Sequence, residues 1–277
     1  MKKIRTQTWM VAAIALGISI FAGSAVLAGP GKDGAAFAWP QGKRAAVSLT
    51  FDDARLTQVD NGHAILNRHG LKATFYVNPD DMMRRLEGWK RAVKDGHEIG
   101  NHTLTHPCTG NFDFSRQNAL EDYTLDRMAA EIDGANDVIV KSLGVKPKTF
   151  GYPCDQSSVG RGADSKSYVP LVAARFTTGR GWTGEASNDP VFCDLFQLVV
   201  TGSDERSFDA LKALVDEAAA QGRWLILCGH EIAAEGVQTT RTGALEALCA
   251  YLADPKNGIW TDTVSRVGDY VREQRTK

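Results

Sequence analysis

Short apolar runs alternate with longer amphipathic stretches from about residue 45 to the end of the chain. Short runs bounded by turn residues are typical of buried strands, and apolar positions repeated every three or four residues are typical of helices. The pattern predicts strands at residues 45–51, 73–77, 98–101, 148–152, 175–178, 195–201, 224–228 and 259–261. It predicts helices at residues 57–69, 80–94, 121–143, 207–221, 240–253 and from about 264 onward.

Strands that alternate with helices are typical of parallel sheets whose strands are joined by crossover connections. About seven such units over about 250 residues fit a closed barrel better than an open sheet. We therefore expect an α/β fold, a distorted (β/α) barrel with about seven parallel strands. Residues 155–162 and 179–190 are rich in Gly, Ser, Asp and Arg, and we interpret both as long loops within one domain.

The first residues have the pattern of a secretory signal peptide. A basic start is followed by an apolar stretch at residues 9–27, which ends in small residues with Ala28 at the expected cleavage position. We expect a signal peptide at residues 1–28, one catalytic domain at residues 29–277, and export to the periplasm or the extracellular space. The alternative is an uncleaved membrane anchor, which the glycines in this stretch make less favourable.

Composition narrows the possible functions. The 277 residues are 43% hydrophobic and 23% charged, with a formal net charge of -1. The chain has no excess of basic residues, so its charge does not point to a nucleic-acid partner. The five cysteines include no CxxC pair, which argues against a cysteine zinc site. Their odd number leaves at least one cysteine free within the chain. Cys108 and Cys154 each follow a proline, and a disulfide between them is one possible pairing.

Polar residues with catalytic chemistry follow several of the predicted strands. They are the pairs Asp52-Asp53, Asn101-His102, Tyr152-Pro153 and Gly229-His230. Active sites of β/α barrels lie at the carboxyl ends of the strands. We therefore expect these side chains, which are far apart in sequence, to meet at one rim.

The spacing of His102 and His106 indicates a metal site. Two imidazoles four residues apart face the same way if the segment forms one helical turn, and imidazole binds divalent first-row metals. Asp53 adds a carboxylate, which leaves coordination positions open for water and substrate. Adjacent residues of a strand point to opposite sides, so Asp52 is expected to remain free to accept a proton. His230 has the chemistry of a general acid.

Purely structural roles for these residues are also possible. The Asp52-Asp53 pair is also what a helix N-cap followed by a solvated acid would look like. His230 could be a partly buried histidine bonded to the backbone.

In this order the motifs resemble those of the polysaccharide deacetylase family, the carbohydrate esterases of the nodulation-deacetylase type. The matching segments are Thr50-Phe51-Asp52-Asp53, His102-Thr103 with His106, Phe150-Gly151-Tyr152-Pro153-Cys154, and Leu225-Ile226-Leu227 leading to His230. The resemblance runs from about residue 45 to residue 270. It implies a general base at Asp52, a general acid at His230, an oxyanion-binding backbone N–H at Cys154, an acetyl pocket lined by Leu227, and metal ligands at Asp53, His102 and His106. We also expect Tyr152 to contact the substrate. The implied metal is Zn²⁺, with Co²⁺ or Ni²⁺ as alternatives.

Two departures from the family pattern concern the third and fourth motifs. The family often has an arginine in the third motif that orients the base, and Gly151 stands in that place. We expect Arg180 to take over this role and Trp182 to be the sugar-facing aromatic residue. A loop ion pair and a packing residue are the alternatives for these two positions.

The predicted function is metal-dependent removal of acetyl groups from N-acetylated sugars of a chitin-, peptidoglycan- or exopolysaccharide-like polymer. An O-acetyl (xylan) esterase with the same site is the nearest alternative. A non-catalytic glycan-binding protein is an alternative from another class. A glycosidase is disfavoured, because adjacent Asp52 and Asp53 cannot flank a scissile bond and the histidine pair would be unexplained. The expected partner is an acetylated polysaccharide, with no nucleic acid and no membrane span after cleavage.

Overall fold

The computed structural model describes residues 37–181, 184 and 186–277. The expected signal peptide at residues 1–28 and the candidate aromatic Trp182 lie outside the described residues. Export therefore remains a prediction from the sequence.

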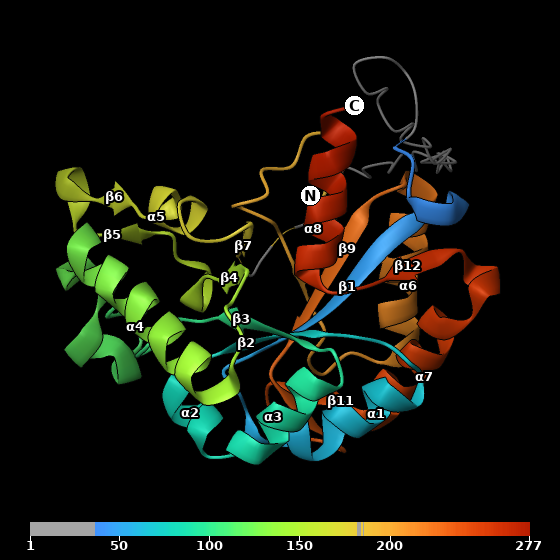
Figure 1. The fold of residues 1–277 in the computed structure, drawn as a ribbon, viewed down its shortest axis with the longest axis horizontal. Helices are drawn as coiled ribbons and strands as arrows, with labels where there is room; N and C mark the ends of the chain where they lie inside the picture. Colours follow the sequence, from blue (N-terminus) through green and yellow to red (C-terminus); the bar gives the residue numbers. More distant parts are fainter. Residues whose placement is uncertain (1–36, 182–183, 185) are drawn as a thin grey trace, which may run out of the picture.

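The described residues form a curled, parallel sheet surrounded by helices (Figure 1). Its strands follow the order β7-β4-β3-β2-β1-β9-β8, and β12 pairs with the start of β1. Their bounds are β1 Ala45–Asp52, β2 Thr74–Val77, β3 Glu98–Asn101, β4 Thr149–Gly151, β7 Thr178–Arg180, β8 Thr201–Gly202, β9 Trp224–Gly229 and β12 Ile259–Thr261. The predicted fold class, a distorted (β/α) barrel, is confirmed.

The distortion lies between the two outer strands of this order, β7 and β8. A strand is predicted at 195–201, but only Thr201–Gly202 forms one. The preceding residues run irregularly beside β7, where Leu198 makes an isolated parallel bridge to Arg180. Thr201 then pairs with Leu227 of β9, so an irregular segment completes the ring of strands.

The helices surround the sheet, with α4 on one side and α1, α3, α7 and α8 around the rest (Figure 1). Their bounds are α1 His63–Arg68, α2 Pro79–Met83, α3 Leu86–Lys94, α4 Leu125–Leu143, α5 Val169–Ala173, α6 Phe208–Gln221, α7 Thr242–Ala253 and α8 Val264–Arg275. Two long helices, α4 and α6, begin after hydroxyl N-caps. The Thr124 side chain accepts a hydrogen bond from the Arg127 N–H, and the Ser207 side chain accepts one from the Ala210 N–H. The helix predicted at 80–94 is broken into α2 and α3.

Alternation along β1 gives the two faces of the strand different neighbours. Leu49 and Phe51 of β1 belong to the main apolar cluster, together with residues of α1, α6 and α7. Thr50 and Asp52 point the other way because successive side chains of a strand alternate. Two short pairs complete the described strands, β5 (Ser158–Val159) with β6 (Lys166–Ser167) and β10 (Glu231–Ala233) with β11 (Thr239–Arg241).

Candidate active site

A pocket of about 630 Å³ lies at the carboxyl ends of the strands. It brings together residues from five parts of the sequence: Asp52, Asp53, Arg55, Asn78, Asp81, His102, His106, Phe112, Phe114, Tyr152, Cys154, Asp155, His230 and Gln238. The expected meeting of the strand-end residues at one rim is therefore observed.

The two acids at the end of β1 reach the same site, contrary to the expectation that they point to opposite sides. Asp52 is the last residue of β1, but Asp53 and Ala54 have left the strand with φ values of 71° and 52°. Strand alternation therefore does not apply to Asp53. His102 Nε2 lies 3.9 Å from Asp52 Oδ2 and 3.4 Å from Asp53 Oδ1, so both carboxylates face one imidazole.

Asp53, His102 and His106 converge on one point with the chemistry of a metal site. His106 Nε2 lies 3.2 Å from Asp53 Oδ1, and the two imidazole rings are 4.8 Å apart. Asp53 Oδ1 is buried and accepts no hydrogen bond from any described residue. Burial raises the pKa of Asp53, but protonated His102 and His106, in the absence of a metal, outweigh it and hold the pKa well below its ordinary value.

The tautomer of His102 shows that these residues fit a cation. His102 Nδ1 lies 2.8 Å from the carbonyl oxygen of Gly151 and must carry a proton to donate to it. In the neutral ring, Nε2 then carries no proton, and its lone pair faces Asp53 Oδ1. Two acceptors directed at each other repel unless a positive charge lies between them, so the donor set fits a divalent ion.

The segment from His102 to His106 is not helical, and a different geometry brings the two imidazoles together. Thr103 and His106 have positive φ values of 65° and 53°. Asn101 Oδ1 accepts from the Thr103 N–H at 2.7 Å. Glu131 of α4 accepts from the N–H and the hydroxyl of Thr105, both at 2.8 Å. Asn101 and Glu131 were not expected from the sequence to support this turn.

Arg180 of β7 forms a buried ion pair with Asp52. Its guanidinium is fully buried and lies 4.2 Å from the centre of the Tyr76 ring. Burial raises the pKa of Asp52, but the Arg180 charge outweighs it and lowers the pKa. Asp52 is therefore ionised, as a base must be.

The position of Gly151 has no room for the arginine that the family often has in the third motif. It pairs directly with Arg180 across β4 and β7. A Cβ atom at residue 151 would lie 2.9 Å from Tyr76 Cγ and 3.1 Å from His102 Nδ1, so no side chain fits without displacing these groups. Arg180 thus places a guanidinium on Asp52 from the neighbouring strand.

The structure does not bring Leu227 into the pocket with the other candidate site residues, because of strand alternation. Leu227 pairs with Leu49 of β1 and belongs to the apolar cluster under the helices. It does not line the main pocket. The next residue, Cys228, faces the interior, and its thiol donates to Asp52 Oδ2 at 3.4 Å.

His230 follows β9 and is held by an acid that the sequence analysis missed. His230 Nδ1 lies 2.7 Å from Asp204 Oδ2, and Asp204 Oδ1 accepts from the His230 N–H. Burial lowers the pKa of His230, but the Asp204 hydrogen bond and the charges of Asp52 and Asp53 outweigh it and raise the pKa. The position of Asp204, just after β8, is the sequence signal that could have revealed it.

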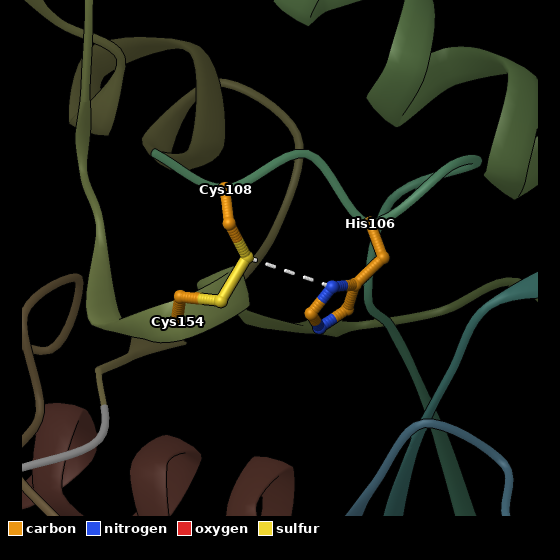
Figure 2. Close-up of side chains that lie close together, drawn as sticks. All are labelled: His106, Cys108 and Cys154. Atoms are coloured by element: carbon orange, nitrogen blue, oxygen red, sulfur yellow. Dashed lines mark hydrogen bonds between the residues drawn. A yellow bond between two sulfur atoms is a disulfide. The ribbon is translucent and has the colours of Figure 1, made fainter. Parts of the chain in front are cut away.

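A disulfide joins the two motif loops, which settles the pairing left open by the sequence. Cys108 and Cys154 are bonded across 46 residues. His106 Nδ1 lies 3.6 Å from Cys108 Sγ, so the disulfide packs against a candidate metal ligand (Figure 2). Cys154 has a left-handed backbone with φ 52° and lines the pocket, which is the place expected of an oxyanion donor.

Tyr152 lines the pocket with its ring, but its hydroxyl group is engaged elsewhere. It donates to the carbonyl oxygen of Phe196 at 2.9 Å. Only the ring of this residue is therefore oriented for contact with a substrate.

Comparison with known proteins agrees with this geometry. Residues 40–160 match the family described as polysaccharide deacetylase. This segment is therefore similar to the polysaccharide deacetylase family. The uncharacterized protein YlxY of Bacillus subtilis is 37% identical over 119 residues, which are 43% of this chain and 32% of YlxY. The peptidoglycan-N-acetylglucosamine deacetylase PgdA of Listeria monocytogenes is 37% identical over 62 residues, 22% of this chain and 13% of PgdA.

The likeness in fold extends beyond the matched segment. A solved structure from Mycobacterium smegmatis, assigned to the polysaccharide deacetylases, superposes with a TM-score of 0.66 and 17% identity. The superposition covers 90% of this chain and 96% of that one. The chain spans about a third of YlxY and a smaller share of PgdA. Within the described residues, no helix is both long and apolar enough to cross a membrane.

Proposed function

We propose that this polysaccharide deacetylase homologue is a metal-dependent hydrolase that removes acetyl groups from N-acetylated sugars of a chitin-, peptidoglycan- or exopolysaccharide-like polymer. One observation carries the proposal: Asp53, His102 and His106 converge beside Asp52 and His230 in an open pocket. A fold alone does not specify a function, so this arrangement of side chains has to do so.

Asp53, His102 and His106 would hold the metal, with Zn²⁺ the best match to one carboxylate and two imidazoles and Co²⁺ or Ni²⁺ as alternatives. A divalent ion held there would supply Lewis-acid chemistry, polarising the acetyl carbonyl and making water a better nucleophile. The remaining steps belong to the chain's own residues.

Asp52 accepts the proton of the attacking water, and Arg180 holds it ionised and oriented. The backbone N–H of Cys154 stabilises the negative charge that develops on the acetyl oxygen. His230 then donates a proton to the departing sugar amine. Asp204 fixes the tautomer and the orientation of His230, because its carboxylate accepts from Nδ1.

The test separates the base and the acid from the metal ligands. Asp52→Asn and His230→Gln should each lower kcat for acetate release at least about a hundredfold and retain the metal. His102→Ala should lose both metal and activity. His69→Gln is the matched control, because His69 pairs with Glu246 and does not line the pocket. Full turnover by Asp52→Asn would refute the assigned role. Parallel assays on N- and O-acetylated oligosaccharides distinguish the deacetylase from the esterase.

A further inference from the structure

Two exposed phenylalanines stand in the pocket wall and have no part in the mechanism above. Phe112 and Phe114 are 45% and 69% exposed. Their rings are 5.4 Å apart with planes inclined by only 17°, so they form a stacked apolar pair. The Phe114 ring lies 6.4 Å from that of His106. Exposed apolar surface beside a polar site is typical of a binding surface.

The loop that carries these rings is held in place from within. The hydroxyl of Ser115 accepts from the Cys108 N–H at 2.8 Å and donates to the Cys108 carbonyl at 2.9 Å. The Thr109 N–H donates to Gln156 Oε1 at 2.6 Å. The disulfide to Cys154 fixes the same loop to the candidate oxyanion site. A surface held in this way loses little conformational entropy when a ligand binds.

We propose that Phe112 and Phe114 form a subsite for the sugar ring next to the one that is deacetylated. The substrate is then an oligosaccharide or polysaccharide that occupies at least two ring positions. This inference rests on the proposed function, because it assumes that an acetylated sugar sits over Asp53, His102 and His106. The closeness of Phe114 to His106 places the neighbouring ring on the aromatic pair.

The chemistry of the pocket favours a neutral sugar ring as the occupant. A pyranose has an apolar C–H face, which suits an aromatic surface without polar atoms, and a rim of hydroxyl groups. Arg55, Asp81 and Gln238 line the same pocket and offer donors and acceptors to such a rim. A few polar groups beside an apolar wall are typical of small-molecule subsites. A protein partner is disfavoured, because the two rings line the pocket.

The experiment compares substrates of different length. We would measure kcat/KM for acetate release from N-acetylglucosamine and from its tetramer in the wild type, Phe112→Ala, Phe114→Ala and the double variant. The tetramer-to-monomer ratio should fall about five- to tenfold in the double variant, the loss expected when one ring face is no longer buried. Phe192→Ala should keep the wild-type ratio, because Phe192 is 63% exposed and does not line the pocket. An unchanged ratio in the double variant would overturn the subsite.

Binding measurements keep the subsite separate from the reaction. If the wild type released no acetate from any N- or O-acetylated sugar, the proposed function would fail. Titration calorimetry with the tetramer would still test the subsite. A five- to tenfold weaker affinity of the double variant, with no matching change for the monomer, supports it. Equal losses for both sugars, or no binding of the tetramer by the wild type, would overturn it.

Discussion

Arg180 and Asp52 form a buried ion pair between β7 and β1, at the candidate active site. Removing one partner of a buried pair leaves an uncompensated charge, which costs about 3 to 5 kcal/mol. Arg180→Met should therefore lower the free energy of unfolding by about this amount in urea denaturation, and it should abolish acetate release.

The control for this prediction is a surface pair of the same chemistry. Arg175 makes two bonds to Asp133, at 2.7 and 2.8 Å, but Asp133 is about half exposed. Arg175→Met should cost no more than about 1 kcal/mol. Equal losses in the two variants would contradict the account of the buried pair.

Asp204 should control the pH range of activity through His230. A general acid must be protonated, so activity falls as pH rises through the pKa of His230, which Asp204 raises. Asp204→Asn should move the alkaline limb of the kcat profile to lower pH. Glu205→Gln makes the same charge change at an exposed neighbour and should leave the limb in place. A limb that does not move in Asp204→Asn would show that another group sets it.

The disulfide should contribute to stability and to the position of His106. Closing a loop of 46 residues stabilises the fold by up to about 4 kcal/mol. Replacing both Cys108 and Cys154 by Ala should lower Tm, and added reductant should lower Tm of the wild type but not of this variant. Cys193→Ala removes a free cysteine and should retain the response to reductant. Metal affinity should also fall when the disulfide is lost, and an unchanged affinity would mean that His106 does not depend on it.

His97 should make the fold sensitive to mild acid. It is buried, and it accepts from the Ala73 N–H at 3.2 Å, which requires an unprotonated Nδ1. Burial, together with the nearby His63 and Lys72, lowers the pKa of His97 to about 3. Its stabilising contribution is therefore complete above the unfolded pKa of about 6.5 and is lost as pH falls below it, by about 1 kcal/mol between pH 7.5 and 5.5. His97→Gln should show a smaller loss over this range, and an equal loss would exclude His97 as the cause.

The strands and the meeting of Asp53, His102 and His106 at one rim were predictable from the sequence, because both follow from local patterns. Apolar runs mark β1, β3 and β9 within one or two residues, and the polar residues after them share a rim because parallel strands end together. β7 begins three residues later than predicted, and residues 195–200 are irregular. Both differences arise where residues 195–200 contact β7 to close the ring of strands, and such contacts between distant segments leave no local pattern in the sequence.

The rest of the site depends on which way each side chain points. Leu227 and Cys228 are adjacent, and only the register of β9 against β1 decides which of them reaches Asp52. In the same way, the pairing of Gly151 with Arg180 decides how the guanidinium reaches the base. No local signal in the sequence distinguishes these alternatives. Asp204 and the pair Phe112 and Phe114 were visible in the sequence, but their role follows only from their positions in space.

The most direct test of the account measures acetate release from an N-acetylated oligosaccharide after chelation, while Zn²⁺ is returned stepwise to the protein. The account predicts that activity disappears on chelation and returns in full at about one bound ion per chain, and that Asp53→Ala neither binds the ion nor recovers. Full acetate release by metal-free protein would contradict it.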